Sequence, residues 1–566
     1  MTGFLKNNFP ILIIILMLFL YLGIKAFDKN GWDGWGFGSA QTLMTVDYWV
    51  KDGFAKNYFL FIAVPYSKLA HYLDEPEFRN RPIDTAGGAL ARDRRLYYSH
   101  YPPLYIVPYA LLGKIGIESR ALFRIFSLLI SLAGLFFFYW FIKSIAGKTA
   151  ATVASIYYGF SVTFLNYADS ISVQPWDILF IFLILSLSVL AWREFVSLRD
   201  ISLLIWLAYF ALSLLSYDAT FFIFAYLVFF DILILKKFFW KRWLFFASAP
   251  VLGFALQIIQ NVWYLGWHDM ISDFSGVYAE RTFRGAKNFI IGLTAPFVSM
   301  TSFQTIFIFK KTAVALTSAI AIFVSLWEIS RPLRQSYSEA SRERNFRQKI
   351  NLHSDYFKIV FILAVAAVVQ PFFVNTTGGW PFAGVLTAPF WGLLIGIASI
   401  FIKNIFQHKE FGIYKTASFG ILTAAVLILW TVQFYSTYNY IKDWPNNKPD
   451  QKVIEFSKEI KTLYPNEEKI TFRILPQNPV WKSQFGTFNM EYYFGMLKID
   501  FANTKDLLAD FLWLRNRSEY PFYSFIVSEN RSDILKIRQE LSDKNIRSFS
   551  PMIEMQGQYL FTVGFK

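Results

Sequence analysis

Asp33 is the residue of this sequence best placed to act as a general base. It stands in a turn rich in Trp and Gly that directly follows the apolar run 10–27. An Asp at such a place can shape a turn or cap a helix, or it can take a proton from a hydroxyl within hydrogen-bond reach. Ser39 lies closer to the next segment with helical spacing and is the better cap, which leaves Asp33 for chemistry. Asp28 and Asp47 are the competing carboxylates.

Basic and hydroxyl side chains follow Asp33 in the polar segment 28–120. Guanidinium groups bind phosphate through paired hydrogen bonds, so a cluster of arginines beside a histidine suits a phosphate ligand. The alternative is that these arginines reach lipid head groups at a membrane surface. The residues concerned are Arg92, Arg94, Arg95, Tyr98, His100 and Tyr101.

Charged residues also stand at the ends of later apolar runs. Asp169, Asp177 and Asp218 are in such positions. A carboxylate at a membrane edge is energetically costly unless it is paired with a cation or hydrated. The three residues therefore indicate a water-filled cavity. Arg124, near the start of another apolar run, could meet such a carboxylate or a phosphate.

The polar segment 266–310 adds further candidates. Arg281 and Arg284 extend the possible phosphate site, and His268 lies beside Asp269. No set of residues has metal-ligand spacing, and the chain has no cysteine, which excludes disulfides and thiolate ligands. No glycine-rich phosphate loop or nucleophile motif is present. The sequence therefore predicts no metal and no cofactor.

The composition is that of a polytopic membrane protein. Of the 566 residues, 55% are hydrophobic, 63 are Phe and only 17% are charged, and several apolar runs reach the length needed to cross a bilayer. The net charge of +15 lies between these runs, where it sets topology and attracts anionic lipids. Membrane lipids are thus expected partners, and nucleic acid is not.

Eleven membrane-spanning helices are expected, with the N-terminus cytoplasmic. With eleven spans, nearly all the loops that carry clusters of Lys and Arg lie on the cytoplasmic side. It requires that segment 101–116, which is short and rich in Pro, is a re-entrant or interfacial helix rather than a span. The expected spans are 10–27, 121–142, 149–167, 175–192, 201–217, 219–235, 243–265, 312–329, 356–374, 381–402 and 412–434.

Two domains are expected. Residues 1–440 form a membrane domain, which includes a long first outer loop, 28–120, with interfacial helices. Residues 441–566 form a small extracytoplasmic α/β domain, because their composition is that of a soluble protein. Helices are predicted there at 453–464, 507–514 and 534–543, and strands at 470–475, 523–527 and 559–563.

The order of these features resembles the GT-C glycosyltransferases, in particular the branch of the protein O-mannosyltransferases and the lipid A aminoarabinose transferases (ArnT-like). Those families have an Asp-Glu pair early in the first outer loop; Asp33 matches the Asp, but Gly34 replaces the Glu. They also have an Arg at the start of the next span, matched by Arg124, and a Pro-x-Asp turn, matched by Pro175 and Asp177.

A Pro-Pro-Leu turn preceded by His or Lys is a further feature of these families. The turn is present at 102–104, but Tyr101 precedes it and His100 comes one residue earlier. The resemblance covers residues 10–235.

The resemblance implies transfer of a sugar from a polyprenyl-phosphate-sugar donor to a protein, lipid or glycan acceptor. The reaction would take place on the outer (periplasmic) face of the cytoplasmic membrane, with inversion, without a metal and with Asp33 as base. A flippase or transporter of lipid-linked intermediates, a polymerase or ligase of surface polysaccharide, and a non-catalytic surface-assembly protein are the alternatives. A transporter would need paired charges deep in several spans, whereas most ionisable residues here stand at their outer edges.

Overall fold

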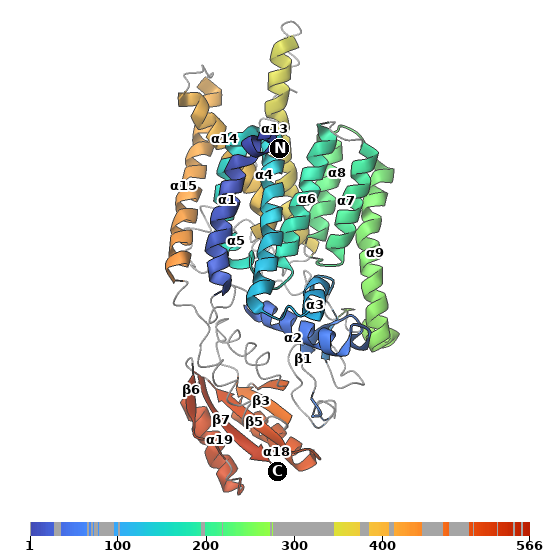
Figure 1. Cartoon of the computed structure of the whole chain (residues 1–566), viewed down its shortest axis with the longest axis vertical. Coiled ribbons are helices and arrows are strands. Elements are labelled where there is room, and N and C mark those ends of the chain that lie inside the picture. The colour runs from blue at the N-terminus through green and yellow to red at the C-terminus, as the bar shows by residue number, and fades with distance from the viewer. Residues whose placement is uncertain are drawn as a thin grey trace. The chain divides into compact units, whose positions relative to one another are not determined.

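The computed structural model forms two compact units (Figure 1). Unit 1 comprises Met1–Asp28, Ser119–Leu256 and Tyr278–Asn446, and unit 2 comprises Lys29–Glu118, Gln257–Val277 and Asn447–Lys566. The structure describes residues 2–27, 36–64, 67–69, 72, 77, 96–99, 102–193, 198–217, 219–271, 274–275, 344–373, 384–406, 413–443, 468–474, 497–501, 503–528, 530–546, 549–555 and 558–565.

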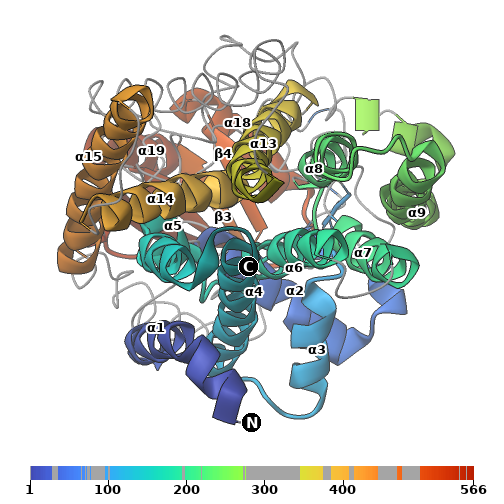
Figure 2. The ribbon, with the colours of Figure 1, turned by 90° about the horizontal axis from the view of Figure 1, so that it is seen from above.

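Unit 1 is a bundle of helices (Figures 1 and 2). Within the described residues, four helices are long and apolar enough to cross a membrane: Asn7–Phe27, Arg120–Gly159, Gln174–Trp192 and Trp240–Leu265. Each expected span overlaps a described helix over most of its length, except 312–329, which lies outside the described residues; the count of eleven stays a prediction. The helices are α1 (Thr2–Phe27), α4 (Arg120–Gly159), α5 (Val162–Tyr167), α6 (Gln174–Trp192), α7 (Leu198–Ser213), α8 (Thr220–Leu233), α9 (Trp240–Leu265, which continues into unit 2), α13 (Arg344–Phe373), α14 (Gly384–Phe406) and α15 (Ile413–Asp443).

Helix α4 is interrupted where the sequence predicts a break between two spans. Gly147 has φ 86° and ψ 174°, which is not a helical conformation. Glycine adopts a positive φ without steric cost, and Lys143 and Lys148 flank this position. The third expected span, 149–167, is therefore the last part of α4 followed by α5.

Helix α4 packs against α1, α6 and α14, and Figure 2 shows it among them. Its approach to α6 depends on Gly134. A Cβ atom at this position would lie 2.7 Å from the Ile178 side chain and 2.9 Å from the Ile178 backbone carbonyl. Real Cβ atoms do not come this close, so only glycine fits between the two helices.

Replacing Gly134 with Ala is expected to destabilise unit 1. The added methyl group must push against helix backbone, and overpacking of this kind costs about 1–3 kcal/mol. Thermal unfolding of the purified protein in detergent measures the effect. Gly420→Ala on α15 is the matched control, because its Cβ would meet nothing within 4 Å. Equal melting temperatures for the two variants would contradict the close helix approach.

The first part of unit 2 holds short elements on a polar loop. They are α2 (Gly36–Asp52), η1 (Ala55–Asn57), β1 (Phe61–Val64), β2 (Leu96–Tyr98) and α3 (Ile106–Lys114). Helix α3 has nine residues, about 13 Å of helix, too short to cross a bilayer; the described part of segment 101–116, residues 102–116, therefore contains no spanning helix, as predicted. The prediction that Ser39 caps the next helix is wrong. Helix α2 already begins at Gly36, and Ser39 is fully buried within it, so packing outweighs the low helix propensity of the two glycines.

The C-terminal part of unit 2 contains a five-stranded sheet in the order β4-β3-β5-β7-β6. Strand β3 is parallel to β4 and β5, and β7 is antiparallel to β5 and β6. The expected strands and helices agree with β3, β5, β7, α18 and α19, whereas β4 and β6 were not predicted and 453–464 lies outside the described residues. The division near residue 440 stays a prediction. The elements are β3 (Glu468–Ile474), β4 (Leu497–Phe501), α18 (Thr504–Arg517), β5 (Phe522–Ser528), α19 (Arg531–Asp543), β6 (Ile553–Met555) and β7 (Gln558–Phe565).

Candidate functional site

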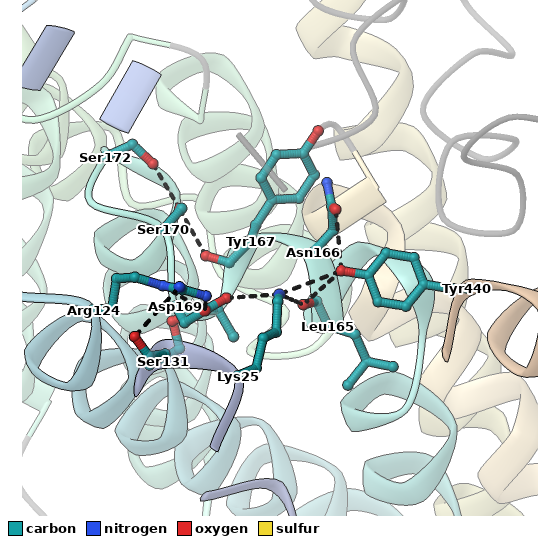
Figure 3. A network of polar contacts seen from close by, with 12 residues as sticks. Lys25, Arg124, Ser131, Leu165, Asn166, Tyr167, Asp169, Ser170, Ser172 and Tyr440 are labelled. Atoms are coloured by element: carbon teal, nitrogen blue, oxygen red, sulfur yellow. Dashed lines mark hydrogen bonds and ion pairs between the residues drawn. The ribbon is translucent and has the colours of Figure 1, made fainter. Parts of the chain in front are cut away.

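A cluster of three buried charges lies at the C-terminal end of α1 (Figure 3). Lys25 Nζ is 3.1 Å from Asp169 Oδ1. Arg124 donates to the other carboxylate oxygen from Nε, at 3.0 Å, and from Nη2. The side chains of Lys25, Arg124 and Asp169 are 3%, 0% and 0% exposed. Both oxygens of the carboxylate are therefore held by cations away from solvent.

Further hydrogen bonds extend the cluster to other elements. Lys25 Nζ also donates to the Leu165 carbonyl at 3.0 Å and to the Tyr440 hydroxyl at 3.3 Å. Arg124 Nη1 is 3.5 Å from the Ala26 carbonyl. Tyr440 is on α15, and its hydroxyl is 3.3 Å from Asn166 Oδ1 on α5. The cluster thus connects α1, α4, α5 and α15 (Figure 3).

The turn that carries Asp169 is fixed by local hydroxyl groups. Ser131 on α4 donates to the Ala168 carbonyl at 2.9 Å, and Ser170 donates to the Tyr167 carbonyl at 2.8 Å.

Pro175 stands in the first turn of α6, where its missing N–H costs nothing. Asp177 follows in that same turn, buried, where the helix dipole favours a negative charge.

Asp169 lies between α5 and α6, outside the spanning helices. Burial alone would raise the pKa of its carboxyl group, but the Arg124 guanidinium and the Lys25 ammonium more than offset this effect. The pKa is therefore below its ordinary value of 3.8. The carboxylate is charged throughout the neutral range.

A lowered pKa in the folded state fixes the pH window in which Asp169 stabilises the protein. The stabilisation is fully present above about pH 4, the ordinary range of an Asp, and is lost only as the pH falls through the lower folded-state value. We expect the difference in melting temperature between the wild type and Asp169→Asn to stay constant from about pH 8 down to about pH 5. A difference that disappears on acidification from pH 7 to pH 5 would mean that burial dominates and the pKa is raised.

The structure brings two of the predicted residues, Arg124 and Asp169, into direct contact. A carboxylate is one of the two kinds of partner expected for Arg124; the other is a phosphate. Lys25 completes the cluster and was missed. It is the single charged residue within the apolar run 10–27, and this is the signal that could have pointed to it. Asp177 is buried at the start of the helix that follows the same turn.

The other predicted site residues lie in unit 2 or outside the described residues. Asp47 is exposed on α2, Tyr98 belongs to β2, opposite Phe61, and His268 is exposed with Nδ1 3.3 Å from Asp269. The remaining predicted residues lie outside the described part of the chain, and their roles stay predictions. They are Asp33, Arg92, Arg94, Arg95, His100, Tyr101, Asp218, Arg281 and Arg284.

The strand that leads to His100 is nevertheless well fixed. Gln257 and Asn261, on the last part of α9, each donate a side-chain N–H to the Ser99 carbonyl at 2.8 Å. The Tyr97 ring packs on Tyr264, with centroids 4.9 Å apart. Two buried amides on a spanning helix therefore hold the residue that immediately precedes His100.

No protein-family model matches the chain, and no curated protein matches its sequence. The solved structures to which the chain is similar include the following two. One is the oligosaccharyltransferase of Archaeoglobus fulgidus in its apo form, at 12% identity and a TM-score of 0.45, covering 92% of this chain and 69% of that one. The other is ArnT from Cupriavidus metallidurans bound to undecaprenyl phosphate, at 12% identity and a TM-score of 0.46, covering 90% of this chain and 98% of that one. Both are GT-C glycosyltransferases, the type that the motifs resemble.

Proposed function

We propose that this protein is a membrane glycosyltransferase. It transfers a sugar from a polyprenyl-phosphate-sugar to an acceptor on the outer face of the cytoplasmic membrane. The observation that carries this proposal is the Lys25–Arg124–Asp169 cluster. It joins three points that are far apart in the sequence: the end of α1, eight residues before Asp33; the start of α4; and the turn before Asp177. Arg124 is one of the places at which the sequence resembles GT-C enzymes, and Lys25 and Asp169 each stand eight residues before another, Asp33 and Asp177.

The chemistry assigns a role to each group of residues. Asp33 removes the proton from the acceptor hydroxyl, whose oxygen forms a bond to the anomeric carbon. The bond between that carbon and the phosphate oxygen breaks, and the polyprenyl phosphate leaves with added negative charge. Cationic donors stabilise this charge in the transition state. We assign this task to His100, Arg92, Arg94, Arg95, Arg281 and Arg284, with Arg124 contributing from the position that Asp169 fixes.

The short helices of unit 2 fit an enzyme that works at a membrane surface. Lys114, at the end of α3, lies 4.5 Å from the centroid of the Phe54 ring, and Gly113 lets α3 pack closely on Val50 of α2. Trp263 and Trp267 near the end of α9 are 55% and 64% exposed. Exposed Trp is typical of the membrane–water boundary, where a lipid-linked donor would present its phosphate.

The test uses the full chain, purified and placed in lipid nanodiscs with defined polyprenyl-phosphate-sugars. We expect release of polyprenyl phosphate that depends on the protein and increases when a hydroxyl acceptor is supplied. Donor that stays intact with every sugar tried would overturn the proposal. In proteoliposomes, movement of intact donor between the leaflets would instead support the flippase alternative.

A further inference from the structure

Part of the first outer loop is built into the core of the C-terminal sheet domain. Leu69 is fully buried and Tyr72 is 5% exposed. Both belong to the same buried hydrophobic cluster as Ile470 and Phe472 of β3 and Phe511 of α18. Burying large apolar side chains removes their surface from water and stabilises the contact. The loop therefore contributes to this core rather than passing over its surface.

Specific hydrogen bonds hold the same loop residues. Ser67 Oγ and the Lys68 backbone N–H both donate to Glu468 Oε2, at 3.0 and 3.1 Å. Glu468 is the first residue of β3. On the other side, the Glu519 backbone N–H donates to the Tyr72 hydroxyl at 3.0 Å. We call residues 67–69 and 72, with these contacts, the loop anchor.

The loop anchor is also connected to α2. Strand β1 ends at Val64, three residues before Ser67. Within β1, the Ile62 N–H donates to Thr45 Oγ1 at 3.0 Å, and Thr45 is fully buried on α2. Helix α2 begins three residues after Asp33. Glu468 thus contacts the loop anchor, the loop anchor follows β1 in the chain, and β1 contacts the helix that follows the proposed base.

We propose that the C-terminal domain positions the first outer loop for catalysis, and that Glu468 is the positioning residue through which it does so. This inference rests on the proposed function, in which Asp33 is the base. A carboxylate that accepts two hydrogen bonds fixes the loop more firmly than apolar contacts alone, because charge-assisted hydrogen bonds are the stronger ones. The domain then acts through backbone placement and needs no contact with the sugar.

The first test separates positioning from simple stability. We expect Glu468→Ala to lower kcat about tenfold while the KM for the lipid donor changes less than about twofold, since misplaced catalytic groups impair the chemical step more than binding. Glu468→Gln keeps an acceptor oxygen and should restore most of kcat. Tyr72→Phe, which removes the acceptor for Glu519 N–H, should lower kcat in the same way. Glu554→Ala is the matched control, because Glu554 is an exposed carboxylate on β6 of the same sheet.

The second test does not need enzyme activity. Hydrogen–deuterium exchange in Glu468→Ala should become faster at the Lys68 and Leu69 amides and also in α2, while Glu554→Ala leaves both unchanged. Faster exchange at 67–69 without any change in α2 or in kcat would overturn the positioning role. If the wild type transfers no sugar, the proposed function fails, and the exchange experiment still shows whether Glu468 controls the loop.

Discussion

Replacing Asp33 with Asn is expected to abolish sugar transfer while the protein still folds and binds its donor. An amide of the same shape cannot take the proton of the acceptor hydroxyl, and loss of a positioned general base costs about 10²–10⁴-fold in rate. Donor binding should persist, because the phosphate and the lipid tail are held by other groups. Release of polyprenyl phosphate measures the rate, and binding of a labelled polyprenyl phosphate measures affinity.

The controls for this variant are the two competing carboxylates. Asp47 is exposed on α2, so Asp47→Asn should leave transfer within about twofold of the wild type, as is normal for a surface substitution. Asp28→Asn tests the other candidate in the same loop. Near-normal turnover in Asp33→Asn together with a large loss in Asp28→Asn or Asp47→Asn would move the base to that residue.

Replacing Asp169 with Asn is expected to give the largest loss of stability in unit 1. The substitution leaves Lys25 and Arg124 as buried cations without their carboxylate, and breaking a buried ion pair costs about 3–5 kcal/mol. Thermal unfolding in detergent measures this loss. Asp355→Asn is the matched control: Asp355 pairs with Lys358 at 2.8 Å, but both side chains are partly exposed, and such pairs contribute about 0–1 kcal/mol.

A triple variant distinguishes a structural cluster from one that also serves catalysis. Lys25→Met, Arg124→Met and Asp169→Leu together remove all three charges, and well-packed apolar replacements of a buried ion cluster are often neutral for stability. We expect the triple variant to fold and to lose transfer. Wild-type transfer by the folded variant would show that the cluster only holds helices together.

The hydrophobic pattern predicts the helices of unit 1 well, because long apolar runs and basic loops are local signals. The break at Gly147 could be predicted because glycine and two flanking lysines mark it. The start of α2 could not, since burial of Ser39 depends on packing that residue types alone do not reveal. The Arg124–Asp169 contact was one of two expected alternatives, and the sequence offers no means of choosing between a carboxylate and a phosphate partner.

The loop anchor shows what sequence reasoning missed and why. Ser67 and Glu468 are about four hundred residues apart, and the loop between β1 and β2 has no periodicity that would mark Leu69 and Tyr72 as core residues. Strand β4 was likewise missed. Its five residues give too short an alternating pattern to stand out, although they pair with β3 along its length. Long-range partners of this kind need three-dimensional information.

The most direct test of the proposed function is an experimental structure of the full chain in nanodiscs with a polyprenyl phosphate bound. We predict that the phosphate lies at the end of the bundle where α1 ends and α4 begins, beside the Lys25–Arg124–Asp169 cluster and within reach of His100. Asp33 should then lie a few ångströms from the place that the sugar carbon would occupy, where it could accept a hydrogen bond from the acceptor hydroxyl. A lipid phosphate bound near the middle of the bundle, or at its opposite end, would contradict the glycosyltransferase and favour a transporter.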